Sequence, residues 1–177
     1  KSYRFITLQE CYAILSGKIR QEGKVAYLSF DDGWQSNLNL IPIIDKYQAP
    51  ITIFVSIDPL LSGNFWWEYA LADGIELRNK MKFVSSLESL KKKYSLERSV
   101  LTEQELVKIA SHPLVSIQSH TMSHPILTNC DDEILSYELN SSKAYLENLL
   151  HHKIEAFSYP NGNFSNREIE AVKKAGY

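Results

Sequence analysis

The feature that most constrains the fold is the alternation of short apolar runs with helical patterns along the chain. The runs KVAYLSF, ITIFVS, LVSIQS and IEAFSY are rich in β-branched or aromatic residues, as strands are. They occupy residues 24–30, 51–56, 114–119 and 154–159. Their nearly continuous apolar character indicates burial on both faces. This order predicts an α/β domain with a parallel sheet, either open or part of a barrel.

Helix starts are marked between these runs by a hydroxyl residue that stands three positions before a glutamate. The stretches are TLQE from Thr7, TEQE from Thr102 and SNRE from Ser165. The hydroxyl accepts a hydrogen bond from a first-turn amide while the glutamate reaches back to the capping residue. Apolar residues at helical spacing predict a further helix of about five turns over residues 131–150.

The chain length and composition predict one domain over residues 1–177. Of the 177 residues, 44% are apolar, which is enough for a sizeable core. The segment 58–101 is too long for a plain crossover between two strands. It contains helical patterns of its own in FWWEYALAD and MKFVSSLESLKKKY. We therefore expect a helical insertion at about 58–101.

Charge and hydropathy argue against several classes of protein. Nineteen basic and 21 acidic residues give a net charge of −2, without a long run of one sign. This balance does not favour nucleic acid as a partner. No apolar run approaches the roughly 18 residues of a membrane span, and the opening KSYRFITLQE lacks the apolar stretch of a signal peptide. The cysteines, Cys11 and Cys130, are interpreted as small core residues.

Three polar clusters follow predicted strands directly. FDDGW follows the first run, SHTMSH the third and SYPNG the fourth. In parallel α/β sheets and barrels, the loops after the strands meet at one edge, where functional sites are built. The sequence therefore predicts that these clusters converge on a site.

Two of these clusters contain residue types that bind divalent metal ions. An Asp-Gly turn alone would explain Asp31 and Asp32, but two adjacent carboxylates repel, and a bound cation would remove that cost. His120 and His124 are spaced so that both rings can face one point, although single histidines are more often plain hydrogen-bonded residues. Together with Asp32 they form a two-histidine, one-carboxylate set that suits zinc or another first-row ion. Such an ion supports hydrolysis of an amide or ester.

These motifs resemble those of the polysaccharide deacetylases that carry the chitooligosaccharide deacetylase homology domain. SFDDG is similar to T-F-D-D-G, HTMSH matches H-[ST]-x-x-H, and FSYPNG resembles R-x-P-Y-G. The resemblance implies a distorted (β/α) barrel. It also implies a metal-dependent hydrolase that removes N-acetyl or O-acetyl groups from a polysaccharide or oligosaccharide, at an extracytoplasmic or cell-envelope location.

The resemblance also implies roles for individual residues. Asp31 would be the general base, and a divalent ion, zinc foremost with cobalt or nickel as alternatives, would be held by Asp32, His120 and His124. The residues of the third motif that would form the substrate and oxyanion group are Tyr159, Pro160 and Asn161. In this group the proline shapes the turn, the asparagine offers its backbone N–H to the oxyanion, and the tyrosine packs beneath the turn.

The chain departs from the family pattern in two ways. Ser158 stands where the family has an arginine that orients the base, and the later Leu-x-His motif, whose histidine serves as general acid, does not occur before Tyr177. Only about four strand units are present, whereas a closed barrel needs roughly seven or eight. We therefore expect a domain that is incomplete at its C-terminus. The open edge of its fourth strand, 154–159, would favour self-association.

Two other functions stay open from the sequence. The missing general acid and Ser158 are consistent with a carbohydrate-binding module whose active site has decayed. The metal motif would also serve another metallohydrolase, such as an amidase on non-sugar amides or a phosphoesterase. Trp34, Trp66 and Trp67 would either line a sugar groove or belong to the core.

Overall fold

The computed structural model describes residues 3–74 and 87–177. Its strands are β1 (Arg4–Ile6), β2 (Val25–Phe30), β3 (Ile51–Val55) and β4 (Val115–Ser119). Its α-helices are α1 (Leu8–Leu15), α2 (Ile41–Tyr47), α3 (Ile57–Ser62), α4 (Trp66–Ala72), α5 (Leu87–Lys93), α6 (Glu103–Ala110), α7 (Asp132–Leu150) and α8 (Asn166–Lys174). The described 3-10 helices are η1 (Gln35–Leu40), η3 (Leu127–Asn129) and η4 (Pro160–Gly162).

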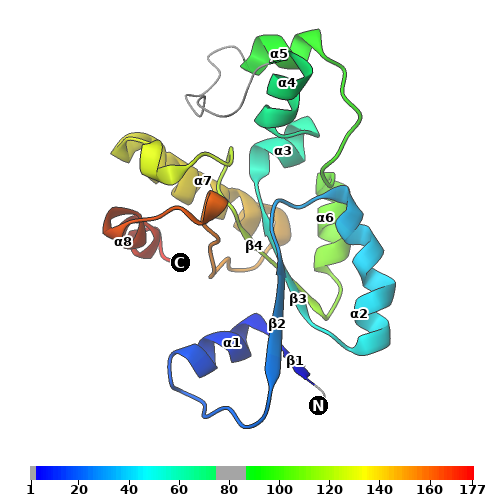
Figure 1. Cartoon of the computed structure of the whole chain (residues 1–177), viewed down its shortest axis with the longest axis vertical. Helices are drawn as coiled ribbons and strands as arrows, with labels where there is room; N and C mark the ends of the chain where they lie inside the picture. Colours follow the sequence, from blue (N-terminus) through cyan, green and yellow to red (C-terminus); the bar gives the residue numbers. More distant parts are fainter. Residues whose placement is uncertain (1–2, 75–86) are drawn as a thin grey trace.

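The four strands form one parallel sheet in the order β1-β2-β3-β4. Each strand lies beside its neighbour in the sequence, and helices connect the strands (Figure 1). The register places Leu28 opposite Ile51, and Ile53 opposite Ile117. Within the described residues this curled sheet does not close, so the fold is a parallel half-barrel with helices around it. The predicted α/β class and the incomplete barrel are confirmed.

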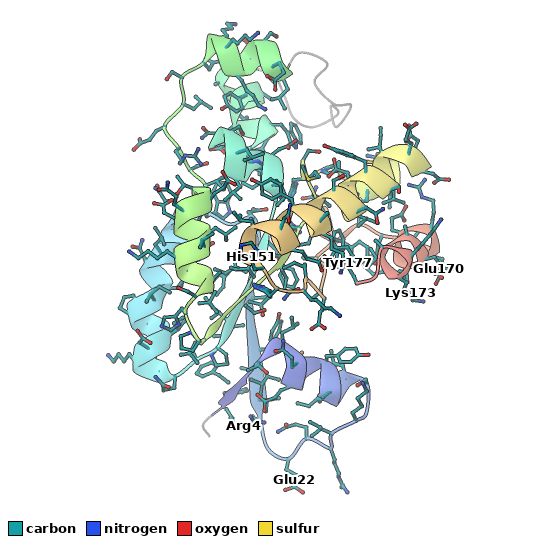
Figure 2. The ribbon with its side chains drawn as sticks, turned by 180° about the vertical axis from the view of Figure 1, so that it is seen from behind. Arg4, Glu22, His151, Glu170, Lys173 and Tyr177 are labelled. Carbon is teal, nitrogen blue, oxygen red and sulfur yellow. The ribbon has the colours of Figure 1, made fainter. Side chains whose placement is uncertain are left out.

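The main core lies between the sheet and the helices that cover it. Buried residues of β3 and β4 pack there with residues of α2, α3, α6 and α7; the aliphatic members are Ile44, Ile51, Ile53, Val55, Ile57, Leu60, Leu101, Leu106, Ile109, Ile117, Leu146 and Ile154. A second cluster joins α7 to α8. Tyr177 belongs to it, lies between these two helices in Figure 2 and donates a hydrogen bond to the carbonyl of Leu139 at 3.0 Å.

The predicted helix starts are confirmed. Thr7, Thr102 and Ser165 each cap a helix, and in each case the glutamate three residues later accepts a hydrogen bond from the backbone N–H of the cap. The long helix α7 begins after Asp131, whose side chain accepts from the N–H of Ile134 at 2.8 Å. These helix starts were predictable from the sequence because a cap needs only residues within one turn.

The predicted strand at 154–159 is wrong as a regular strand. Only one parallel bridge joins this segment to β4, between Ser119 and Phe157. Gln118 Oε1 accepts hydrogen bonds from the N–H groups of Glu155 and Ala156, at 3.0 and 2.8 Å. A side chain therefore satisfies these two N–H groups, while the backbone of Ser119 pairs with Ala156 and Ser158.

The first strand was not predicted. β1 has only three residues and pairs with β2, with Arg4 opposite Val25. A run of three residues is too short to show a strand pattern. Its pairing therefore depends on β2 rather than on its own sequence.

Between β3 and α6 the chain forms α3, α4 and α5, which stand together at one end of the molecule (Figure 1). α4 covers most of the pattern FWWEYALAD. The pattern MKFVSSLESLKKKY begins in 75–86, outside the described residues, and α5 covers part of its end. That 58–101 is an insertion stays a prediction. No helix in the described part of the chain has the length and apolarity to cross a membrane.

Candidate metal centre

The loop after β2 gives Asp32 an unusual backbone and a fixed side chain. Asp32 and Gly33 both have positive φ, at 75° and 81°, and a Cβ at Gly33 would lie 3.1 Å from a methyl carbon of Val55. Glycine is therefore required where this loop crosses β3. Trp34 Nε1 donates to Asp32 Oδ2 at 3.0 Å, and the backbone of Trp34 forms a bridge with Val100. These contacts hold Asp32 at the end of the strand.

His120 follows β4 directly and is only 1% exposed. Its backbone N–H donates to the carbonyl of Val55 at 2.9 Å, which continues the pairing of β3 with β4. Its ring Nδ1 lies 2.8 Å from the carbonyl of Ser158. A carbonyl can only accept, so Nδ1 carries the proton and Nε2 is left as a free electron-pair donor.

His124 lies on the loop that follows. Thr121 and His124 both have positive φ, at 74° and 58°, which is uncommon for residues other than glycine. The N–H of His124 donates to Thr121 Oγ1 at 3.0 Å. The loop thus turns back on itself, so that the second histidine faces the same point as the first. Their ring centroids are 4.8 Å apart.

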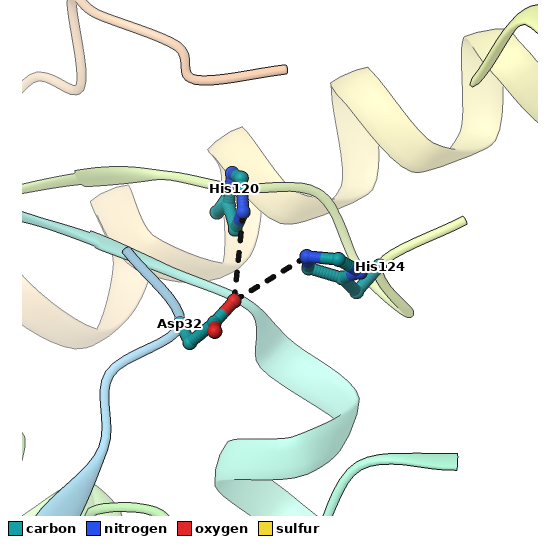
Figure 3. Close-up of side chains that lie close together, drawn as sticks. All are labelled: Asp32, His120 and His124. Carbon is teal, nitrogen blue, oxygen red and sulfur yellow. Dashed lines mark ion pairs between the residues drawn. The ribbon is translucent and has the colours of Figure 1, made fainter. Parts of the chain in front are cut away.

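The side chains of Asp32, His120 and His124 meet at one point (Figure 3). The distances to Asp32 Oδ1 are 3.6 Å from His120 Nε2 and 3.3 Å from His124 Nε2, and one ligand atom of each residue lies within 4.8 Å of the others. Two ligand atoms that are each about 2.1 Å from a tetrahedral ion are about 3.4 Å apart. The distances from both histidines to Asp32 Oδ1 are therefore close to the spacing that a single divalent ion requires.

An orphaned buried atom also points to a cation. Asp32 Oδ1 is buried and has no hydrogen-bond partner among the residues that the structure describes. A buried carboxylate oxygen without a partner is costly. A divalent ion between Asp32 and the two imidazoles would remove that cost, so the residues present fit such an ion.

The electrostatics favour the protonation states that a metal needs. Burial opposes ionisation of Asp32, but the neighbouring His124 and His120 imidazoles and the hydrogen bond from Trp34 outweigh burial and lower its pKa below the usual value. Burial, and then the charge of His124, lowers the pKa of His120. The carboxylate is therefore ionised and His120 is neutral near pH 7. Metal ligands must be in these states.

Asp31 lies beside the three residues but faces solvent. Ser158 Oγ donates to Asp31 Oδ2 at 3.4 Å, a long hydrogen bond. The same residue, through its carbonyl, holds His120. Ser158, which stands where the family has an arginine, therefore contacts both the predicted base and a predicted ligand.

The third motif forms the short helix η4, in which Asn161 is exposed and has a φ of 55°. Tyr159 packs against Phe157 and Phe164, with ring centroids 5.2 and 4.8 Å away. In the described part of the chain, no hydrogen bond or ring contact joins Tyr159, Pro160 or Asn161 to the three metal-binding candidates. Their predicted roles at the oxyanion stay predictions.

Aromatic residues surround His124, and sequence reasoning singled out two of them, Trp66 and Trp67, but missed Phe65. The Trp67 ring is 4.8 Å from the His124 ring and stacks on buried Phe65 at 4.0 Å. Trp66 Nε1 donates to the His124 carbonyl at 3.3 Å, and Trp34 contacts Phe65 at 5.0 Å. The sequence predicted that the tryptophans either line a sugar groove or belong to the core. In the structure, Phe65, Trp66 and Trp67 contact His124 directly.

Sequence reasoning also missed Glu138. This residue is 2% exposed and hydrogen-bonds to the loop between the two histidines. A signal was present in the sequence, because Glu138 occupies a helical position shared with buried Leu135, Leu139 and Leu146. A charged residue in the apolar stripe of a helix needs a buried partner.

The chain resembles known proteins in sequence. The family described as polysaccharide deacetylase matches residues 18–177. Over 176 residues the chain is 25% identical to YxkH of Bacillus subtilis strain 168, named as a candidate polysaccharide deacetylase; the match covers 99% of this chain and 50% of YxkH. The chain therefore spans half the length of that relative.

Solved structures share the fold at lower identity. The Streptococcus pyogenes deacetylase PplD, in complex with acetate, superposes with a TM-score of 0.72 at 23% identity, over 99% of this chain and 63% of that one. IcaB from Ammonifex degensii gives 0.70 at 20% identity, over 99% and 67%. The half-barrel is thus of the deacetylase type. Because the family match covers nearly the whole chain, including the aspartate and histidine motifs, the chain belongs to the polysaccharide deacetylase family.

Proposed function

We propose that this chain removes acetyl groups, N-linked or O-linked, from a polysaccharide or oligosaccharide with the help of one divalent ion. Asp32, His120 and His124 would hold the ion, with zinc foremost and cobalt or nickel as alternatives. The observation that carries the proposal is the convergence of two imidazole nitrogens on the buried, unpartnered Asp32 Oδ1. When bound, such an ion polarises a carbonyl and makes water a better nucleophile.

The two neighbouring aspartates have different tasks. Asp32 is held by a hydrogen bond from Trp34, and its other oxygen faces the two histidines. Asp31 is exposed, and among the described residues its carboxylate accepts one long hydrogen bond, from Ser158 Oγ, so it can take a proton from the attacking water. The backbone N–H of Asn161 would donate to the developing oxyanion, while Pro160 and Tyr159 shape the turn beneath it.

The proposal extends to the setting of the protein. Its partner would be an acetylated polysaccharide outside the cytoplasm or in the cell envelope. The same proposal includes a single domain over 1–177 with a helical insertion at about 58–101. It also includes self-association through the open barrel edge at 154–159. A molar mass that rises with concentration in sedimentation is expected, and a constant monomer mass would contradict self-association.

The test of the reaction is acetate release by matched variants. Asp31→Asn should keep metal binding but lower the rate about 10²–10⁴-fold, because it removes the base alone. His124→Ala should lose both metal and rate. An unchanged rate in Asp31→Asn would show that Asp31 is not the base.

The substrate panel for this test contains N-acetylated and O-acetylated oligosaccharides, a non-sugar amide and a phosphoester. Acetate from the sugars alone is the expected result. Sugar binding without turnover in the metal-loaded protein would favour a decayed carbohydrate-binding module instead. Hydrolysis of the non-sugar amide or release of phosphate would favour another metallohydrolase.

A further inference from the structure

Glu138, on α7, is a buried carboxylate that contacts the loop carrying the second histidine. Its Oε2 accepts hydrogen bonds from the N–H groups of Met122 and Ser123, at 2.8 and 2.9 Å, and its Oε1 accepts from Ser123 Oγ at 2.5 Å. Its side chain is 2% exposed. Met122 and Ser123 are two of the three residues between His120 and His124. One carboxylate therefore holds the centre of that loop.

The loop needs such an anchor. Thr121 and His124, on either side of the two held residues, both have positive φ, a conformation that costs energy in residues other than glycine. Such a conformation persists only where surrounding contacts impose it. A buried carboxyl group that accepts three hydrogen bonds from one loop supplies contacts of this kind. These contacts come from α7, a helix that starts eight residues after His124.

We propose that Glu138 is a positioning residue of the metal centre. By holding Met122 and Ser123, it keeps the His124 ring within reach of Asp32 Oδ1, so that the two histidines and the aspartate can share one ion. The residue does not touch the ion, because its carboxylate oxygens are occupied by the loop. The inference rests on the metal centre of the proposed function, but not on the reaction catalysed there.

The chain contains a matched control for this role. Glu168, on α8, is also buried, at 1% exposed. It too accepts hydrogen bonds from a serine N–H and hydroxyl, those of Ser165, at 2.7 and 2.6 Å. However, Glu168 caps its own helix and has no described contact with the loop of residues 120–124. Removal of either glutamate deletes a buried carboxylate, but only one removal should disturb the metal ligands.

The test is direct binding of Zn²⁺ and Co²⁺ by calorimetry, together with the visible absorption of bound Co²⁺, which reports the geometry of its ligands. Glu138→Leu should raise the Kd about 10–100-fold, as the loss of outer contacts to metal ligands does, and should change the Co²⁺ spectrum. Glu138→Gln should stay close to the unmodified protein, because its carbonyl can accept from both backbone N–H groups while its amide donates to Ser123 Oγ. Glu168→Leu should leave Kd and spectrum unchanged.

The outcomes separate the two proposals. If the unmodified protein binds neither ion, the proposed metal centre fails. If it binds and Glu138→Leu binds equally well, or if Glu168→Leu weakens binding as much, only the role of Glu138 is overturned. Should Glu138→Leu not fold, Glu138→Asp keeps the charge but withdraws the carboxylate from the loop. An unchanged Kd and Co²⁺ spectrum in that variant would also overturn the proposal.

Discussion

His120 and His124 present the same ring nitrogen to Asp32, yet they are held by different kinds of contact. His120 continues β4, where its N–H pairs with the carbonyl of Val55 and its ring meets the carbonyl of Ser158. Backbone groups therefore fix it. His124 lies on a loop in which it and Thr121 have positive φ. Its ring is contacted by side chains from a distant part of the chain, Phe65 and Trp67.

This difference shows how one site combines a rigid half with a half that depends on individual side chains. Backbone pairing persists whenever the parallel sheet forms, so His120 is placed by the fold itself. The position of His124 depends on the aromatic residues before and within α4, on the Thr121 hydroxyl and on Glu138. We expect changes far from the metal centre in sequence to affect the second histidine more than the first.

The largest effect is expected from Phe65→Ala, which removes a fully buried ring beneath Trp67 and His124. The free energy of unfolding should fall by about 3–5 kcal/mol. Zinc affinity should fall as well, because the His124 ring loses its support. Urea unfolding and calorimetry measure the two quantities. Leu106→Ala, in the core of α6, is the control: it should lose about 2–5 kcal/mol of stability and keep its affinity for zinc.

The next largest effects on stability are expected when each of the two histidines is replaced in turn. Without metal, His120→Ala should lower the free energy of unfolding by on the order of 2 kcal/mol, because it leaves a cavity and an unpaired carbonyl on Ser158. His124→Ala should cost about half as much, since its ring lies on a loop. Urea unfolding in the presence of a chelator measures both. Equal losses would show that the fold does not distinguish the two histidines.

The smallest effect is expected outside both halves of the site. Thr102→Ala removes the cap of α6 and should cost about 1 kcal/mol without changing zinc affinity.

The backbone hydrogen bond from Thr102 lowers the pKa of Glu105. A lowered carboxyl pKa adds stability that is present above about pH 4.5 and is lost as the pH falls through the folded-state pKa. If Thr102→Ala also loosens the contact with Glu105, the free energy of unfolding of the variant, measured in urea, should change less between pH 7 and pH 3 than that of the unmodified protein. Weaker zinc binding by Thr102→Ala would contradict the assumed independence of α6.

Features that depend on neighbours in the sequence were predictable. The caps at Thr7, Thr102 and Ser165, the runs that became β2, β3 and β4, and the placement of polar clusters after strands all follow from residues within a few positions of one another. The pairing of His120 and His124 with Asp32 was also predictable, because parallel strands bring their carboxyl ends to one edge. Local hydrogen bonding and the direction of the strands determine these features.

Other features were decided only by the tertiary structure. Gln118 binds two backbone N–H groups of the segment 154–159, which forms one bridge with β4, and β1 is held by its pairing with β2. Glu138 and Phe65 reach the loop of His124 from other parts of the chain. Each case requires a contact between residues far apart in sequence. The sequence alone therefore determined which residues gather at the sheet edge, whereas three-dimensional packing decided how firmly each of them is held.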